Sequence, residues 1–187
     1  TGFPPEPNSD LSPVIAMNLE TGAELWPRNI PYNTGDWTTW IAGVNGGRVY
    51  ASRSGGGGNV FPFPNGQAKM YGLDVVTGNI VFTSVGTTCA GPYEGVVFAP
   101  NGDLIIGDFR NITRIRASDG ITAWQGNRVG SVSGTCGAAI NAAANAVYVC
   151  DAVGGGHSIK RFDLDTGTFR YQSPVMPGGT VQNTPLV

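Results

Sequence analysis

The sequence predicts an all-β protein, because one hairpin motif recurs along the chain with strand-like flanks and turn residues. Four copies each place a glycine four residues before an aromatic residue. The pairs are Gly22 and Trp26, Gly78 and Phe82, Gly120 and Trp124, and Gly167 and Tyr171. Successive glycines are 56, 42 and 47 residues apart. A period in the forties with strands on either side is typical of the four-stranded blade of a β-propeller.

The first copy, AMNLETGAELW over residues 16–26, shows why each copy is interpreted as a hairpin. Apolar residues alternate before the turn, at Ile15, Met17 and Leu19, as in a half-buried strand. The pair Thr21-Gly22 supplies the turn, since glycine adopts positive φ at little cost. A second strand then ends on the aromatic residue. A large ring that recurs once per blade is expected to be buried between neighbouring sheets.

The repeats divide the chain, as a single domain, into antiparallel four-stranded blades with partial blades at both ends. The predicted segments are a partial blade at 13–27, full blades at 38–84, 94–126 and 137–172, and the first strand of a further blade at 180–187. Three full blades with open ends predict an arc of a larger propeller, because repeat arrays need stacked neighbours. A small ring, or a ring completed by a second copy, is the alternative.

The four copies resemble the tryptophan-docking motif of the pyrroloquinoline quinone (PQQ) type, or quinoprotein-like, propeller repeat, A-x-D-x-x-T-G-x-x-x-W. The first copy matches at Ala16, Thr21, Gly22 and Trp26, with Asn18 at the Asp position. The other copies match at Asp74, Thr77 and Gly78, at Gly120 and Trp124, and at Asp163, Thr166 and Gly167. The resemblance implies the propeller fold over nearly the whole chain. It does not assign a function, because the repeat occurs in quinone enzymes and in scaffolds without a cofactor.

Composition excludes several classes of protein. The chain has 187 residues, of which 41% are hydrophobic and 13% charged, with a net charge of −2. This composition is that of a folded protein, and the absence of a basic stripe argues against a nucleic-acid partner. No apolar run approaches the roughly 18 residues of a membrane span. The sequence starts at Thr1 without Met or a signal peptide, so we expect either a processed chain or a piece of a longer one.

The loops opposite the Thr-Gly turns are predicted to carry any ligand, because binding residues concentrate on loops held by a rigid scaffold. The candidate binding residues of this face are Asp36, Trp37, Trp40, Tyr93, Glu94, Asp108, Arg110, Asp151 and His157. Trp37 and Trp40 either form an aromatic platform or pack between blades. Asp151 and His157 either share an ion, which two ligands alone do not hold, or His157 is a solvated loop residue.

Three cysteines fall on the same predicted face. Cys136 and Cys150 flank the turn at residues 143–144 symmetrically, which suits a disulfide; Cys89 is the alternative partner of Cys136. Unpaired thiols are the other interpretation. No C-x-x-C motif is present, so no zinc site is predicted. Asn111-Ile112-Thr113 is a glycosylation sequon, which makes Asn111 a candidate acceptor.

The sequence favours a non-catalytic propeller scaffold for protein or ligand binding, extracellular or periplasmic, without a cofactor or a metal. A protein partner or further chain is expected to cover the open blade edges. The first alternative is a fragment of a PQQ-dependent oxidoreductase. The resemblance implies for such an enzyme a Ca²⁺-binding Glu/Asn/Asp set and a tryptophan floor beneath the quinone, and no residue here matches that set. The second alternative is a structural subunit of a surface layer or filament, completed by neighbouring copies.

Overall fold

The computed structural model is all-β, as predicted. It describes residues 13–31, 36–55, 69–86, 95–107, 111–128, 137–153 and 156–177. Strands and turns make up these ranges, and no helix lies within them. It follows that none of the described segments is a helix able to cross a membrane. The chain divides into two compact units, residues 1–92 and 93–187, and each is described by itself.

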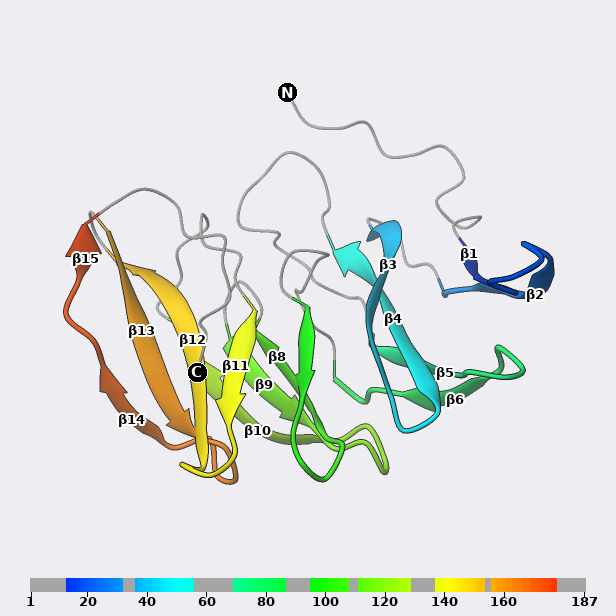
Figure 1. Cartoon of the computed structure of the whole chain (residues 1–187). Coiled ribbons are helices and arrows are strands. Elements are labelled where there is room, and N and C mark those ends of the chain that lie inside the picture. The colour runs from blue at the N-terminus through cyan, green and yellow to red at the C-terminus, as the bar shows by residue number, and fades with distance from the viewer. Residues whose placement is uncertain are drawn as a thin grey trace. The chain divides into compact units, whose positions relative to one another are not determined.

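The first unit consists of a hairpin and a four-stranded antiparallel sheet (Figure 1). The hairpin pairs β1 (Pro13–Met17) with β2 (Glu24–Asn29). The sheet has the order β3 (Asp36–Asn45), β4 (Arg48–Gly55), β5 (Tyr71–Asp74) and β6 (Ile80–Thr83). Gly46 and Gly47 join β3 to β4 with φ values of 56° and 73°, as a two-residue hairpin turn requires.

The core of the first unit lies between the hairpin and the sheet. It contains Val14, Trp26 and Ile30 from the hairpin region and Ala51, Tyr71 and Leu73 from the sheet. Val14 is buried while Ile15 and Met17 are 49% and 60% exposed, so only one face of the hairpin packs on the sheet. The opposite face presents its apolar side chains to solvent.

The second unit consists of two antiparallel sheets (Figure 1). The first has the order β10 (Thr122–Asn127), β9 (Asn111–Ile115), β8 (Leu104–Gly107) and β7 (Val96–Phe98). The second has the order β11 (Ala138–Asn141), β12 (Ala146–Val153), β13 (Gly156–Asp163) and β14 (Phe169–Gln172), with β15 (Met176–Pro177) also on β13.

Strand β15 was not predicted from the sequence. β13 pairs with β14 through Arg161 and Tyr171, and with β15 through His157 and Met176. The two short strands therefore follow one another along the same edge of β13. Pro174 lies between them and has no N–H to donate, which explains the interruption. The predicted strand at 180–187 lies outside the described residues.

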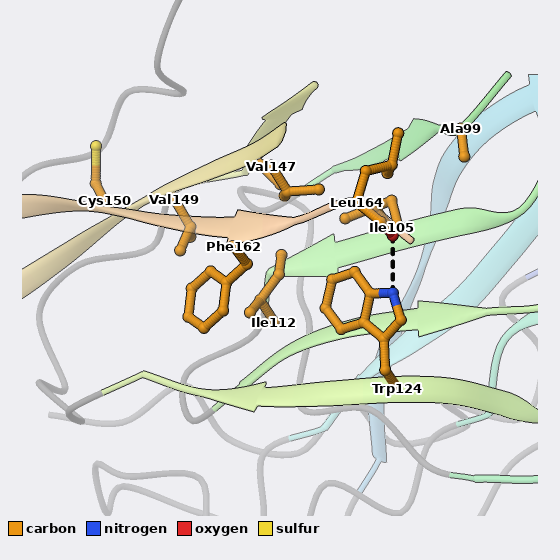
Figure 2. Close-up of a cluster of buried hydrophobic side chains, with 10 residues drawn as sticks. Ala99, Ile105, Ile112, Trp124, Val147, Val149, Cys150, Phe162 and Leu164 are labelled. Carbon is orange, nitrogen blue, oxygen red and sulfur yellow. Dashed lines mark hydrogen bonds between the residues drawn. The ribbon is translucent and has the colours of Figure 1, made fainter. Parts of the chain in front are cut away.

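The core of the second unit fills the space between its two sheets, as Figure 2 shows. Ile112 and Trp124 come from the first sheet, and Val147 and Phe162 from the second. Gly126 allows the close approach, because a Cβ there would lie 2.6 Å from the Phe162 ring. The remaining members of this cluster are Ala99, Ile105, Ala138, Val149, Cys150 and Leu164.

This packing predicts a difference between two isoleucines of one hairpin. Ile112 is fully buried, whereas Ile121 is 43% exposed. Ile112→Ala should lower the free energy of unfolding by about 2–5 kcal/mol, because it leaves a cavity between the sheets. Ile121→Ala should cost less than about 1 kcal/mol. Urea denaturation measures both, and equal losses would show that the sheets do not pack in this way.

Candidate interaction site

Four turns of the same geometry join the third and fourth strands of the sheets, and the two strands of the first hairpin. We call residues 18–22, 74–78, 116–120 and 163–167 the docking turns. In each, the glycine N–H donates to the carbonyl oxygen four residues earlier, at 2.8–3.0 Å. The four glycines have φ between 69° and 75°, a region that other residues rarely adopt. The motif found in the sequence therefore builds one shape four times.

In two of the docking turns the first side chain caps the turn. Asp74 Oδ1 accepts hydrogen bonds from the N–H groups of Val76 and Thr77 at 3.1 and 2.7 Å. The bond from the Thr77 N–H is the largest of the effects that hold the pKa of Asp74 below its usual value. Because the pKa is lowered on folding, this stabilisation is complete at neutral pH and is lost as pH falls below about 4. Asn18 Oδ1 makes the same bonds to Glu20 and Thr21, which explains an amide at the acidic position of the motif.

A tryptophan of one sheet or hairpin docks on the turn of the next within each unit. In the first unit, Trp26 Nε1 donates to the Val75 carbonyl oxygen at 3.2 Å, and a Cβ on Gly78 would lie 2.5 Å from the indole. In the second, Trp124 Nε1 donates to Leu164 at 2.9 Å, the bond dashed in Figure 2. A Cβ on Gly167 would lie 2.6 Å from that ring. Gly78 and Gly167 are thus required both for their φ and for the contact with the ring.

The four repeat aromatics occupy equivalent backbone positions, as predicted. Each lies opposite a residue next to a register shift, in the pairs Ala16 and Trp26, Gly72 and Phe82, Arg114 and Trp124, and Arg161 and Tyr171. The prediction that all four are buried is wrong for the last. Trp26, Phe82 and Trp124 are 6–9% exposed, whereas Tyr171 is 47% exposed. Tyr171 lies on the outer strand β14, where none of the described residues forms a sheet that covers its ring.

Within the described part of the chain, Tyr171 is a ring with no turn against it, and one docking turn conversely has no ring against its glycine. The turn of residues 18–22 has the hydrogen bonds and the glycine φ of the other docking turns. A Cβ on Gly22, however, would meet nothing within 4 Å. Among the described residues, no ring therefore lies against Gly22, whereas the repeat ring of Tyr171 lies exposed. Each of these two features is a candidate interaction site of its own unit.

A buried ion pair lies elsewhere in the second unit. Lys160 Nζ is 2.8 Å from Asp151 Oδ2, and the two side chains are only 5% and 2% exposed. Arg128 Nη2 donates to the nearby Cys150 carbonyl oxygen at 2.7 Å. Taking both charges out of water is costly, so the pair depends on mutual neutralisation. Its position within the sheet and its direct pairing suit a structural role.

A second pair connects strand β9 to the docking turn that receives Trp124. Arg114 Nε donates to Asp103 at 2.8 Å, and its Nη1 donates to the Leu164 carbonyl oxygen at 2.8 Å. Burial raises the pKa of Asp103, but hydrogen bonds from the Ala117 N–H, Asn101 and Arg114 outweigh it and lower the pKa overall. A cavity of about 320 Å³ opens beside this guanidinium, lined in part by Asn145.

Sequence reasoning missed these pairs. Arg114 and Lys160 stand at strand positions where the first full blade has Gly72 and Tyr71, and Asp103 directly precedes strand β8. A charged residue at a position that is apolar in other repeats was the available signal. Which partner each would find depends on the packing of neighbouring strands, which the sequence does not display.

Of the sequence-predicted binding residues, few can be placed. Trp40 is buried in β3 and so offers no exposed platform, which agrees with the packing interpretation. Asp151 faces Ser158 across the ladder and His157 faces Ala152, so strand alternation directs Asp151 and His157 to opposite faces. A shared ion between them is therefore not supported. His157 is a half-buried residue of β13 rather than a loop residue. Tyr93, Glu94, Asp108, Arg110 and the side chains of Asp36 and Trp37 lie outside the described residues.

The cysteine and glycosylation predictions are not tested. Cys150 is buried in β12, while Cys89 and Cys136 lie outside the described residues, so the disulfide stays a prediction. The ladder pairs Ala138 with Val149, which is one residue away from the symmetric register assumed for the cysteines. Asn111 begins β9 and is half-buried, and its modification also stays a prediction.

The described residues do not fit a Ca²⁺ site for PQQ. No three His, Cys, Asp or Glu side chains gather within the part of the chain that the structure describes. Several of its aspartates are instead engaged by basic groups: Asp103 by Arg114, Asp119 by Arg116, Asp151 by Lys160 and Asp163 by Arg170. A Ca²⁺ site needs several oxygen ligands from one cluster, and these carboxylates are spread over separate pairs.

Comparison with known proteins supports the fold alone. No family model and no curated protein matches the chain. BamB from Moraxella catarrhalis is similar in structure, with a TM-score of 0.55 and 16% identity over 89% of this chain and 47% of that one. A europium-containing methanol dehydrogenase has a TM-score of 0.52 and 13% identity over 72% of this chain and 26% of that one. Both are β-propellers, which confirms the predicted PQQ-type propeller fold. The chain spans about half the length of the first and a quarter of the second.

The docking contact predicts that substitution by asparagine destabilises the protein to different extents at two glycines of similar φ. Gly167→Asn introduces a Cβ 2.6 Å from the Trp124 ring, whereas at Gly95, with φ of 61°, it meets nothing within 4 Å. Asn tolerates positive φ at both sites, so the backbone cost is matched. Urea denaturation should show Gly167→Asn to be about 1–3 kcal/mol more destabilising than Gly95→Asn. The excess should disappear in a Trp124→Ala background, and an excess that persists there would refute the ring contact.

The buried ion pair predicts a double-mutant result. Lys160→Met should cost about 3–5 kcal/mol in unfolding free energy, because Asp151 is left charged and buried. Lys160→Met with Asp151→Leu should recover most of that loss. Arg116→Met, which removes the cation of the half-exposed pair with Asp119, is the control and should have a much smaller effect. If Lys160→Met were as mild as the control, Asp151 would not depend on Lys160.

Proposed function

We propose that the chain is part of a non-catalytic β-propeller scaffold that binds protein partners outside the cytoplasm. The observation that carries the proposal is the distribution of apolar and charged side chains. Ile15, Met17 and Leu25 on the first hairpin are 49–62% exposed, and so are Phe169, Tyr171 and Val175 near the last strands, at 47–52%. Exposed apolar groups gathered on two sheet faces are typical of surfaces that another protein covers.

The charged groups support the same proposal. The described aspartates named above are engaged in ion pairs, and Asp74 caps its turn. A catalytic carboxylate is generally poised beside a substrate cleft with a perturbed pKa that suits proton transfer near neutral pH. The resolved shifts of Asp74, Asp103, Asp119 and Asp163 are all downward, which keeps these groups ionised. A location outside the cytoplasm rests on the low share of charged residues, 13%, and belongs to the proposal.

The alternative, a fragment of a PQQ-dependent dehydrogenase, draws on one observation, the likeness to a europium-containing methanol dehydrogenase. At 13% identity this likeness concerns the fold. The two proposals differ in whether the purified chain binds PQQ together with a metal ion. They are therefore separable by a direct titration.

The test adds PQQ to the purified chain with Ca²⁺ or Eu³⁺ and follows quinone absorbance and europium luminescence. The scaffold proposal predicts no saturable change beyond that of PQQ and metal mixed with urea-unfolded chain. Stoichiometric saturation, with a shifted quinone spectrum that requires the folded chain, would overturn the scaffold proposal in favour of the enzyme.

A further inference from the structure

We propose that a second copy of this chain supplies the ring for the empty docking turn, so that Tyr171 of one copy docks on residues 18–22 of the other. This inference rests on the proposed scaffold function and names the partner of its exposed faces. The contact is head to tail, because the ring and the turn come from different parts of the chain. Such a contact closes into a ring where the rotation permits and extends into a filament where it does not.

Tyr171 has the position of a docking ring. It lies opposite Arg161 in the ladder, as Trp124 lies opposite Arg114, and the same register shift follows. In Trp124, and likewise in Trp26, that position carries the ring onto a docking turn within the same unit. Tyr171 remains 47% exposed, with the Arg161 guanidinium stacked on its ring at 6.0 Å. A repeat ring that leaves half its surface in water is suited to pack on a docking turn, as Trp26 and Trp124 do.

The turn of residues 18–22 is preformed for such a ring. Gly22 donates to the Asn18 carbonyl oxygen at 2.8 Å, the bond present in the turns that already hold tryptophans. Leu19 has the same position in its turn as Val75 and Leu164, whose carbonyl oxygens accept the indole N–H groups. Leu19 is 99% exposed. No described residue lies within 4 Å of a Cβ built on Gly22. A tyrosine ring can therefore occupy this space without rearrangement of the turn.

The surroundings of the ring and the turn are complementary in charge and in apolar character. The Arg161 guanidinium stacks on Tyr171, while Glu20 and Glu24 lie close to Gly22 in the chain and are exposed. Opposite charges across an interface favour the correct register of the partners. The outward face of the same hairpin adds exposed apolar side chains, and Met17 is 60% exposed. The surroundings of Tyr171 thus carry a cation and those of Gly22 carry anions.

The size of a known propeller gives an independent argument for a second copy. Of this chain 89% matches 47% of BamB from Moraxella catarrhalis. Two copies would therefore supply about as many residues as that propeller contains. Closed propellers leave only short, protected edges, and head-to-tail pairing of two copies would cover the exposed face of each.

The test measures the native mass of the purified chain by light scattering after gel filtration, for wild type and three variants. Tyr171→Ala removes the ring, and Gly22→Asn places a side chain where the ring would sit. Gly46→Asn is the matched control, because Gly46 also has positive φ and nothing within 4 Å of its Cβ position. Circular dichroism checks that every variant retains the β fold.

We expect wild type and Gly46→Asn to have at least twice the mass of one chain, and Tyr171→Ala and Gly22→Asn to have the mass of one. A wild-type monomer would overturn the inference, whether the faces stay bare or are covered by further chain or another protein. An assembly that survives both site variants would overturn it as well. Either outcome leaves the scaffold proposal standing, because that proposal fails only on PQQ and metal binding.

Discussion

The structure depends on one repeated contact, an indole seated on the glycine turn of the next sheet. In the first unit it joins the hairpin to the four-stranded sheet, and in the second it joins the two sheets. The contact combines apolar burial with a hydrogen bond from the indole nitrogen to a turn carbonyl, so a buried polar group is satisfied where it arises. A β-sheet has two faces to cover, and this contact fixes how each neighbour covers one of them.

The turn glycine carries two constraints at once, which explains why the motif survives sequence change around it. Positive φ already favours glycine, and the ring above Gly78 or Gly167 leaves no room for a Cβ. The first position of the turn is freer: Asp74 and Asn18 both accept the same backbone bonds, whereas Arg116 at this position donates to the side chain of Asp119. Ion pairs such as Arg114 with Asp103 then attach further strands to the same turn. The site and the core are therefore built from one set of interactions.

The fold could be predicted from the sequence because period, alternation and turn chemistry are local properties. The hairpins around Gly22, Gly78, Gly120 and Gly167 follow from them directly. The exposure of Tyr171 could not be predicted, since it depends on whether another sheet covers β14. Asp151 was selected as a loop ligand, yet it is buried against Lys160, a residue whose neighbours become known only when β12 and β13 are in register. Strand β15 likewise could not be predicted, because it forms only where β13 extends beyond the residues that pair with β14.

Hydrogen exchange at the Trp124 indole tests the central contact most directly. Its Nε1–H donates to Leu164 at 2.9 Å within the core, whereas solvent-exposed indoles exchange rapidly. Nuclear magnetic resonance of nitrogen-15-labelled protein in deuterated water measures this exchange. The indole proton should exchange as slowly as the most protected amides of β8 and β9, because exchange at either place requires the unit to open. Loss of the Trp124 indole signal within minutes, while those amides persist, would contradict the account, since the sheets would then be held together without the docked ring.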